Sequence, residues 1–82
     1  MKTFSVRIVA NDGVVLEKEA VALRLRGVDG RFTTLADHAA LVSRLAEGTV
    51  VLENPDGQCD EVAIVGGFLR IEKNKAVLTI TR

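Results

Sequence analysis

The sequence has 82 residues, 48% of them hydrophobic, and its 11 Lys and Arg residues balance 11 Asp and Glu residues. This length fits one small domain over residues 1–82 and excludes two domains joined by a linker. Zero net charge and only three aromatic residues, all Phe, argue against binding to nucleic acid or to an anionic membrane surface. The single cysteine, Cys59, cannot close an intramolecular disulfide, and no apolar run approaches the roughly 18 residues that a membrane span needs. We therefore expect a reducing compartment, no direct membrane insertion, and recognition through local shape.

The N-terminal part of the chain carries strand patterns separated by a turn. Polar and apolar residues alternate over residues 3–8, which predicts a half-buried strand. Residues 11–13 are Asn-Asp-Gly, residue types that tolerate the positive φ of a tight turn, and an extended run restarts at 14–16. A second clear alternation over residues 19–26 predicts another strand with one buried face.

The C-terminal half contains further short strands between strong turn signals. Gly48 opens a strand, Asn-Pro-Asp-Gly at 54–57 ends it, and strand patterns follow at 62–65, 68–71 and 76–81, the last two joined by a polar hairpin at 72–75. Together these segments predict an all-β fold, a two-sheet antiparallel β-sandwich or flattened barrel of about eight to ten short strands. The residues expected to line its interior include Val6, Ile8, Leu23, Leu25, Leu78 and Ile80.

Residues 35–46 give a conflicting signal. Leu35, Ala39, Val42 and Leu45 recur at spacings of three and four, and the segment is rich in Ala and Leu, which favour helix. On its pattern alone, this segment predicts a short helix within an otherwise all-β chain.

The chain offers few residues for catalysis or metal binding. Catalysis by Cys59 and the single histidine, His38, would need an orienting third group and an oxyanion site, and the sequence places neither; one His with one Cys also supplies too few ligands for zinc. Neither a dinucleotide-binding glycine motif nor a phosphate-binding loop is present. We therefore predict no catalytic, cofactor-binding or metal-binding residues, and we interpret His38 as a loop or interface residue.

Two other features each allow a structural and a functional interpretation. Gly66-Gly67 lies inside a strand pattern, which marks a bulge or a place where another backbone comes close. The polar hairpin at 72–75 carries Lys73 and Lys75, and biotinyl and lipoyl carrier domains are sandwiches of similar length with a modified lysine at a hairpin tip. Its flanking residues do not match the carrier motifs, so an exposed turn is the simpler interpretation.

Several stretches together resemble the N-terminal β-sandwich domain of the epsilon subunit of F-type ATP synthases, called delta in mitochondria. The most specific is the segment at 27–41, which begins Gly-Val-Asp-Gly and ends Leu-Ala-Asp-His-Ala-Ala-Leu. It is similar to the family's Gly-x-x-Gly segment followed by Leu-Pro-Gly-His-Ala-Pro-Leu. The openings at 4–9 and 11–15, Gly48-Thr49-Val50-Val51, the segment at 65–71 and that at 74–78 match other family landmarks in order and spacing.

This chain departs from the family pattern at several positions. Ala36, Asp37 and Ala40 replace the usual Pro, Gly and Pro, and the loss of both prolines accounts for the helical pattern of residues 35–46. The resemblance therefore implies a loop followed by a strand there. Arg31 stands where an acidic residue is common. Typical members also continue into a C-terminal helical hairpin, which residues 1–82 do not include.

The resemblance implies a non-catalytic rotor subunit of the central stalk, which docks on the gamma shaft and the membrane c-ring and couples ion-driven rotation to ATP synthesis. It implies a peripheral location on the cytoplasmic face of a bacterial plasma membrane, or on the matrix or stroma side in an organelle. The residues it assigns to the ring-facing loop are Asp29, Gly30 and Arg31. The residues it assigns to the gamma-facing surface are His38, Leu41, Val42, Ser43, Gly66, Gly67 and Phe68. The alternative is a carrier domain with a modifiable lysine in the hairpin at 72–75.

Overall fold

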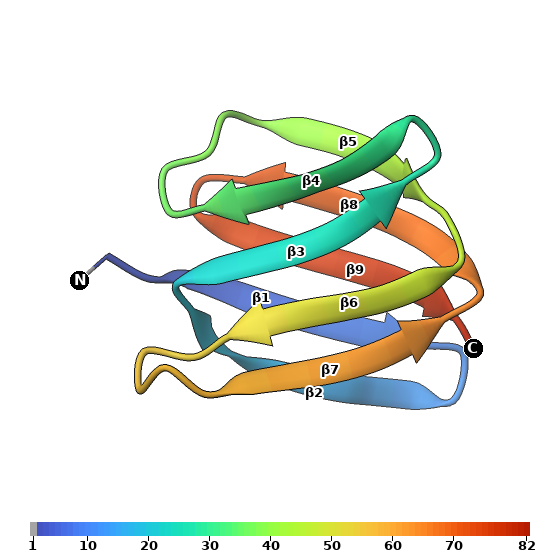
Figure 1. Ribbon diagram of the computed structural model, residues 1–82, viewed down its shortest axis with the longest axis horizontal. Helices are drawn as coiled ribbons and strands as arrows, with labels where there is room; N and C mark the ends of the chain where they lie inside the picture. Colours follow the sequence, from blue (N-terminus) through green and yellow to red (C-terminus); the bar gives the residue numbers. More distant parts are fainter. Residues whose placement is uncertain (1) are drawn as a thin grey trace.

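The computed structural model describes residues 2–82, and every helix or strand in that range is a β-strand (Figure 1). The prediction of an all-β fold is therefore confirmed. The strands are β1 Phe4–Ala10, β2 Gly13–Ala20, β3 Ala22–Gly27, β4 Gly30–Leu35, β5 Leu41–Leu45, β6 Gly48–Glu53, β7 Cys59–Ile64, β8 Gly66–Glu72 and β9 Lys75–Thr81. The segment with a helical pattern forms a loop and strand β5, as the resemblance implied.

The strands form one hydrogen-bonded sheet that curls into two layers. Its order is β2-β1-β9-β8-β5-β3-β6-β7, with β4 paired to the side of β3. Strands β5 and β3 pair only through Gly27 and Leu45, so the sheet turns sharply between them. Figure 1 shows the result, a layer of β4, β3, β6 and β7 facing a layer of β5, β8, β9, β1 and β2. This arrangement is the expected sandwich or flattened barrel.

The expectation of antiparallel pairing needs one correction. Strands β1 and β9 are parallel, with partners running from Ser5 and Lys75 to Val9 and Thr79. Every other pair of described strands is antiparallel. Parallel neighbours require a long crossover, and here nearly the whole remaining chain forms it. Alternation along a strand shows which side chains face inward, but it does not show which strand lies beside it.

The core lies between the two layers and is built from the inward-facing residues of both. The six residues predicted from alternation to line the interior are all buried. The fully buried large side chains are Val6, Ile8, Leu23, Val50, Leu52, Leu69 and Leu78. Burial of apolar area at roughly 25 cal/mol per Å² is the main force that holds the layers together.

One polar side chain is buried within this core. Thr34 on β4 has no exposed surface, and its hydroxyl oxygen lacks a hydrogen-bond partner in the described structure. A buried hydroxyl without a partner costs free energy that an apolar group of the same shape does not.

We therefore expect Thr34→Val to raise the free energy of unfolding by about 1 kcal/mol. Thr33 is the matched control because it is exposed on the opposite face of the same strand, where water solvates its hydroxyl. Thr33→Val should change stability by less than about 0.5 kcal/mol. Urea unfolding of both variants tests this, and equal effects at the two positions would contradict it.

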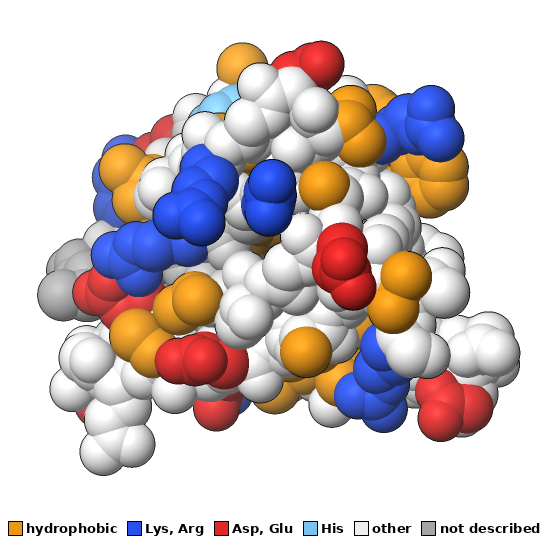
Figure 2. All heavy atoms as spheres, turned by 45° about the vertical axis from the view of Figure 1, so that its right-hand side comes forward, with side chains coloured by type: hydrophobic (Ala, Val, Ile, Leu, Met, Phe, Trp, Pro, Cys, Tyr) orange, Lys and Arg blue, Asp and Glu red, His pale blue; other side chains and the backbone are white. Residues whose placement is uncertain are grey.

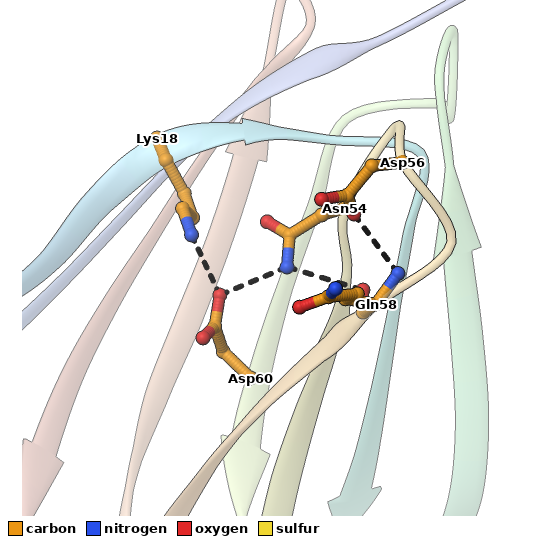
Figure 3. Close-up of polar contacts among 5 residues, drawn as sticks. All are labelled: Lys18, Asn54, Asp56, Gln58 and Asp60. Carbon is orange, nitrogen blue, oxygen red and sulfur yellow. Dashed lines mark hydrogen bonds and ion pairs between the residues drawn. The ribbon is translucent and has the colours of Figure 1, made fainter.

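Polar contacts join the two end strands of the curled sheet, β2 and β7 (Figure 3). The Lys18 ammonium on β2 lies 2.7 Å from the Asp60 carboxylate on β7. The Asn54 side-chain amide donates to the same carboxylate at 3.1 Å and to the Gln58 carbonyl at 3.1 Å. These contacts bridge the seam where the sheet does not close by strand pairing.

The stability that these contacts contribute depends on pH. The Lys18 and Asn54 side chains donate hydrogen bonds to Asp60 and lower the pKa of its carboxyl group. Because folding lowers this pKa, the ionised Asp60 carboxylate stabilises the folded state. This stabilisation is fully present above the unfolded-state pKa of about 4 and is lost as pH falls through the folded-state pKa. We therefore expect Asp60→Asn to be less stable than the wild type at pH 7 and to approach it in stability as pH falls below the unfolded-state pKa and through the lowered folded-state pKa.

Chemical denaturation at a series of pH values measures this effect. Glu61→Gln is the control, because Glu61 is an exposed neighbour on β7 that makes no ion pair within residues 2–82. A difference between Asp60→Asn and the wild type that stayed constant from neutral to acid pH would refute the role of the charge.

Candidate functional site

The residues predicted to face the ring lie at the tip of the β3–β4 hairpin. Gly27 pairs with Gly30, so Val28 and Asp29 form the turn, and Gly30 has a φ of +134°, which favours glycine. The Val28 amide donates to the Arg44 carbonyl at 3.1 Å, which ties the turn to β5. The structure thus brings these residues together on an exposed turn. It adds Val28, which is 57% exposed at the tip and was missed by the sequence analysis.

His38 lies in the loop between β4 and β5, at the opposite end of β4 from the hairpin tip (Figure 1). The preceding residue, Asp37, has a φ of +65°, so it adopts the left-handed conformation at the position where the family usually has glycine. Its amide donates to the Asn74 side-chain oxygen at 2.6 Å. Its carboxylate accepts a hydrogen bond from Lys2 and raises the pKa of that ammonium group. These bonds hold the loop in the absence of the usual prolines, and they leave His38 exposed.

An exposed apolar face lies on the outside of strands β5, β8 and β9. We define this apolar face by Val42, Phe68 and Val77, whose exposed fractions are 72%, 53% and 39%. The strand registers place them close together, because Arg70 pairs with both Val42 and Val77 and lies two residues from Phe68. Together with polar neighbours they line a shallow groove of about 630 Å³. A cluster of this kind is a common feature of protein interfaces.

Only some of the residues predicted to face the shaft lie on the apolar face. Val42 and Phe68 share the apolar face, whereas Leu41 packs against the core and Ser43 is half-buried in the same phase of β5. Val77 was not among the predicted residues, although its position between the apolar residues Ala76 and Leu78 of an alternating strand pattern was a usable signal. Alternation alone could have separated Val42 from its two neighbours on the strand.

Gly66 and Gly67 differ in what they accommodate. Gly67 has a φ of +151°, and a Cβ atom there would collide with the Thr79 carbonyl and lie 2.9 Å from the Ile80 Cα. At Gly66 an added Cβ would approach only the Leu45 carbonyl, at an ordinary 3.6 Å. Of the two interpretations of this pair, the bulge is not found, because Gly66 and Gly67 pair with β9 without a register shift, and the close backbone approach is found at Gly67, against β9. A substitution at Gly67 would disturb the fold itself.

The described residues contain neither a cluster of side chains suited to metal binding nor a helix suited to crossing a membrane. Within residues 2–82, no three His, Cys, Asp or Glu side chains gather where they could hold a metal ion. That range also contains no helix long and apolar enough to cross a membrane. The fold is that of a small β-sandwich domain, and its most prominent surface features are the exposed turn at residues 28–30 and the apolar face.

The family of this domain is shown by sequence comparison. The family model described as "ATP synthase, Delta/Epsilon chain, beta-sandwich domain" matches residues 3–81, and the chain belongs to this family. The ATP synthase epsilon chain of Campylobacter fetus is 39% identical over 80 residues, covering 98% of this chain and 62% of the relative. That of Bacillus cytotoxicus is 37% identical over 81 residues, covering 99% and 60%. The chain thus spans about three fifths of the length of these curated relatives.

Solved structures show the same fold. A chain of the Euglena gracilis mitochondrial ATP synthase, in a structure of OSCP, F1 and the c-ring, matches with a TM-score of 0.93 at 23% identity. The match covers 98% of this chain and 51% of that one. A chain from the Tetrahymena thermophila mitochondrial ATP synthase central stalk and c-ring matches with a TM-score of 0.81 at 9% identity, covering 99% and 65%. The resemblance inferred from the sequence is confirmed at the level of family and fold.

Proposed function

We propose that this domain is a non-catalytic rotor part of the central stalk of an F-type ATP synthase. The family match over residues 3–81 is the observation that carries the proposal, because relatives in that family are named ATP synthase epsilon chains. In this role the domain transmits the rotation of an ion-driven ring and lies peripherally on the cytoplasmic face of a bacterial membrane, or on the matrix or stroma side in an organelle. The family assignment accounts for the chain without a modified lysine, so we propose no carrier function for Lys73 or Lys75.

The apolar face is the part of the surface best suited to the gamma shaft. Permanent interfaces are more apolar than the rest of a protein surface, and Val42, Phe68 and Val77 are the exposed apolar side chains gathered on one layer. His38, in the loop that leads into β5, lies at one end of the same surface. The exposed turn at residues 28–30 protrudes at the far end of β4, and it forms the second contact, with the ring.

A rotor part has to resist deformation between its two contacts. The layers are packed through fully buried side chains such as Ile8, Leu52 and Leu69, and close-packed protein interiors have low compressibility. The apolar face lies on the outside of β5, β8 and β9, and the hydrogen bond from the Val28 amide to the Arg44 carbonyl ties the turn at residues 28–30 to β5 within this packed body. Force applied at one contact is therefore passed to the other with little internal movement.

A single charge on the apolar face tests the shaft contact. We expect Val42→Glu to lower recovery of the gamma subunit by about tenfold or more, because an unpaired charge in an apolar interface is costly. The assay uses the chain, tagged at its C-terminus, as bait in gently solubilised membranes of the native host, with bound subunits quantified by mass spectrometry.

Val14→Glu is the matched control, because Val14 is a 53% exposed valine on β2, outside the apolar face. It should retain gamma, the ring and the catalytic subunits at the wild-type level. Equal recovery with the two variants would refute the placement of the shaft contact. A folded wild-type bait that recovered none of these subunits would count against the rotor role itself.

A further inference from the structure

Three arginines line a shallow groove on the layer opposite the apolar face. Arg24 and Arg26 project from β3 and Arg31 from β4, and the groove, of about 600 Å³, also includes Thr33 and Thr49. We call this the basic groove and define it by the three arginines. Figure 2 shows several basic side chains gathered together on the left side of its view. Only Arg31 belongs to the set predicted to face the ring.

Two of these arginines have no acidic partner within the described part of the chain. Arg24 is bound to the Glu53 carboxylate at 2.9 Å. Arg26 and Arg31 pair directly across β3 and β4, and within residues 2–82 neither makes an ion pair with a carboxylate. Like charges directly opposite one another destabilise a sheet. The free domain therefore carries two like-charged residues directly opposite each other on β3 and β4, which lowers its own stability.

The groove is built on a rigid part of the fold. Strand β3 is paired on one side with β4 and on the other with β6, and the Ala46 amide donates to the Arg26 carbonyl at 2.8 Å. The aliphatic stem of Arg26 runs beside Gly48, where an added Cβ would lie 3.6 Å from its Cβ and Cδ atoms. A fixed position of this kind lowers the entropy that a ligand must overcome on binding.

We propose that the basic groove docks an acidic segment of a partner protein, whose carboxylates are bound by Arg26 and Arg31. The guanidinium group matches a carboxylate in shape and charge and forms paired hydrogen bonds with it. Charge complementarity selects this occupant. A nucleic acid is disfavoured because Phe32, the aromatic residue that lines the groove, packs against the core, and the chain has no net positive charge. The proposal does not depend on the identity of the rotor partners.

Binding of a fluorescein-labelled hexaglutamate peptide tests the proposal directly. We expect fluorescence anisotropy to report saturable binding that weakens as salt is added. Replacing both unpaired arginines, Arg26→Gln with Arg31→Gln, should lower the affinity about tenfold or more. The control is Arg7→Gln with Arg70→Gln, which removes the same charge from arginines outside the groove, and it should bind like the wild type. Absence of binding to the folded protein, or equal losses in the two double variants, would overturn the proposal.

A charge reversal separates binding from folding. Arg31→Glu places a carboxylate opposite Arg26, so we expect the Tm to rise by about 2–4 °C while peptide binding is lost. Loss of peptide binding together with a fall in Tm would mean that Arg31 serves the fold. Inorganic phosphate and an oligothymidylate are the competing probes. If either displaced the peptide at a lower concentration than unlabelled hexaglutamate does, the choice of an acidic polypeptide would be wrong.

Discussion

Gly67→Ala is expected to lower the free energy of unfolding by about 3 kcal/mol or more, because the new methyl group meets backbone atoms that have no rotamer to escape to. The positive φ of Gly67 adds conformational strain, and the atoms in the way are the Thr79 carbonyl and the Ile80 Cα. Strand β9 lies between β1 and β8, so it cannot shift without disturbing both neighbours. Thermal unfolding followed by circular dichroism should show a Tm lower by about 12 °C or more.

Gly66→Ala is the control for this experiment. Gly66 is the adjacent residue on β8 and has no positive φ, and an added Cβ makes only an ordinary contact there. We expect a change of less than about 1 kcal/mol. Similar destabilisation by the two variants would show that the close approach to β9 is not the reason for glycine at position 67.

The second large effect is expected at Leu69, where a truncation should act on stability and spare the docking surface. Leu69 is fully buried and pairs with Leu78 across β8 and β9, so Leu69→Ala removes core contacts and leaves a cavity. The expected loss is about 3 kcal/mol. Its neighbour Phe68 is 53% exposed on the apolar face, and Phe68→Ala should cost less than about 1 kcal/mol.

The two neighbouring truncations should therefore have opposite signatures. Urea unfolding measures stability, and recovery of the gamma subunit at a temperature where both variants are folded measures docking. Leu69→Ala is expected to be unstable yet to bind, and Phe68→Ala to be stable yet to bind less. If recovery of the gamma subunit fell in proportion to the loss of stability in both variants, the apolar face would have no separate role in docking.

Alternation of side chains predicted most of the strands, since it follows directly from the geometry of a half-buried sheet, but it did not predict β4 or β5. Alternation could not predict which strands or side chains lie next to each other in the fold. The parallel pair of β1 and β9 and the Lys18–Asp60 contact both join segments that are far apart in the chain. Periodicity was misleading at residues 35–46, where the apolar residues at helical spacing belong to the end of β4, a loop and β5, and only the family resemblance indicated a loop and strand.

The candidate surfaces were predicted less completely than the fold. The family resemblance pointed to the hairpin tip and the strand pattern to the glycine pair, but exposure depends on which face of a strand each residue occupies in the assembled sheet. Val42 and Phe68 meet on the apolar face because β5 and β8 pair in one particular register. The Arg26–Arg31 pair is likewise a product of the β3–β4 register. A shift of one residue would have placed different side chains on each surface.

The parallel pairing of β1 and β9 determines how the domain responds to tension between its ends. The chain enters β1 at one end of the sandwich and leaves β9 at the other (Figure 1). Pulling the two termini apart therefore slides these strands past each other and loads their hydrogen bonds together, in shear. A hairpin pulled at its open end would instead break its bonds one after another. The first and last strands thus form a clamp, and the sandwich cannot be unzipped from its termini.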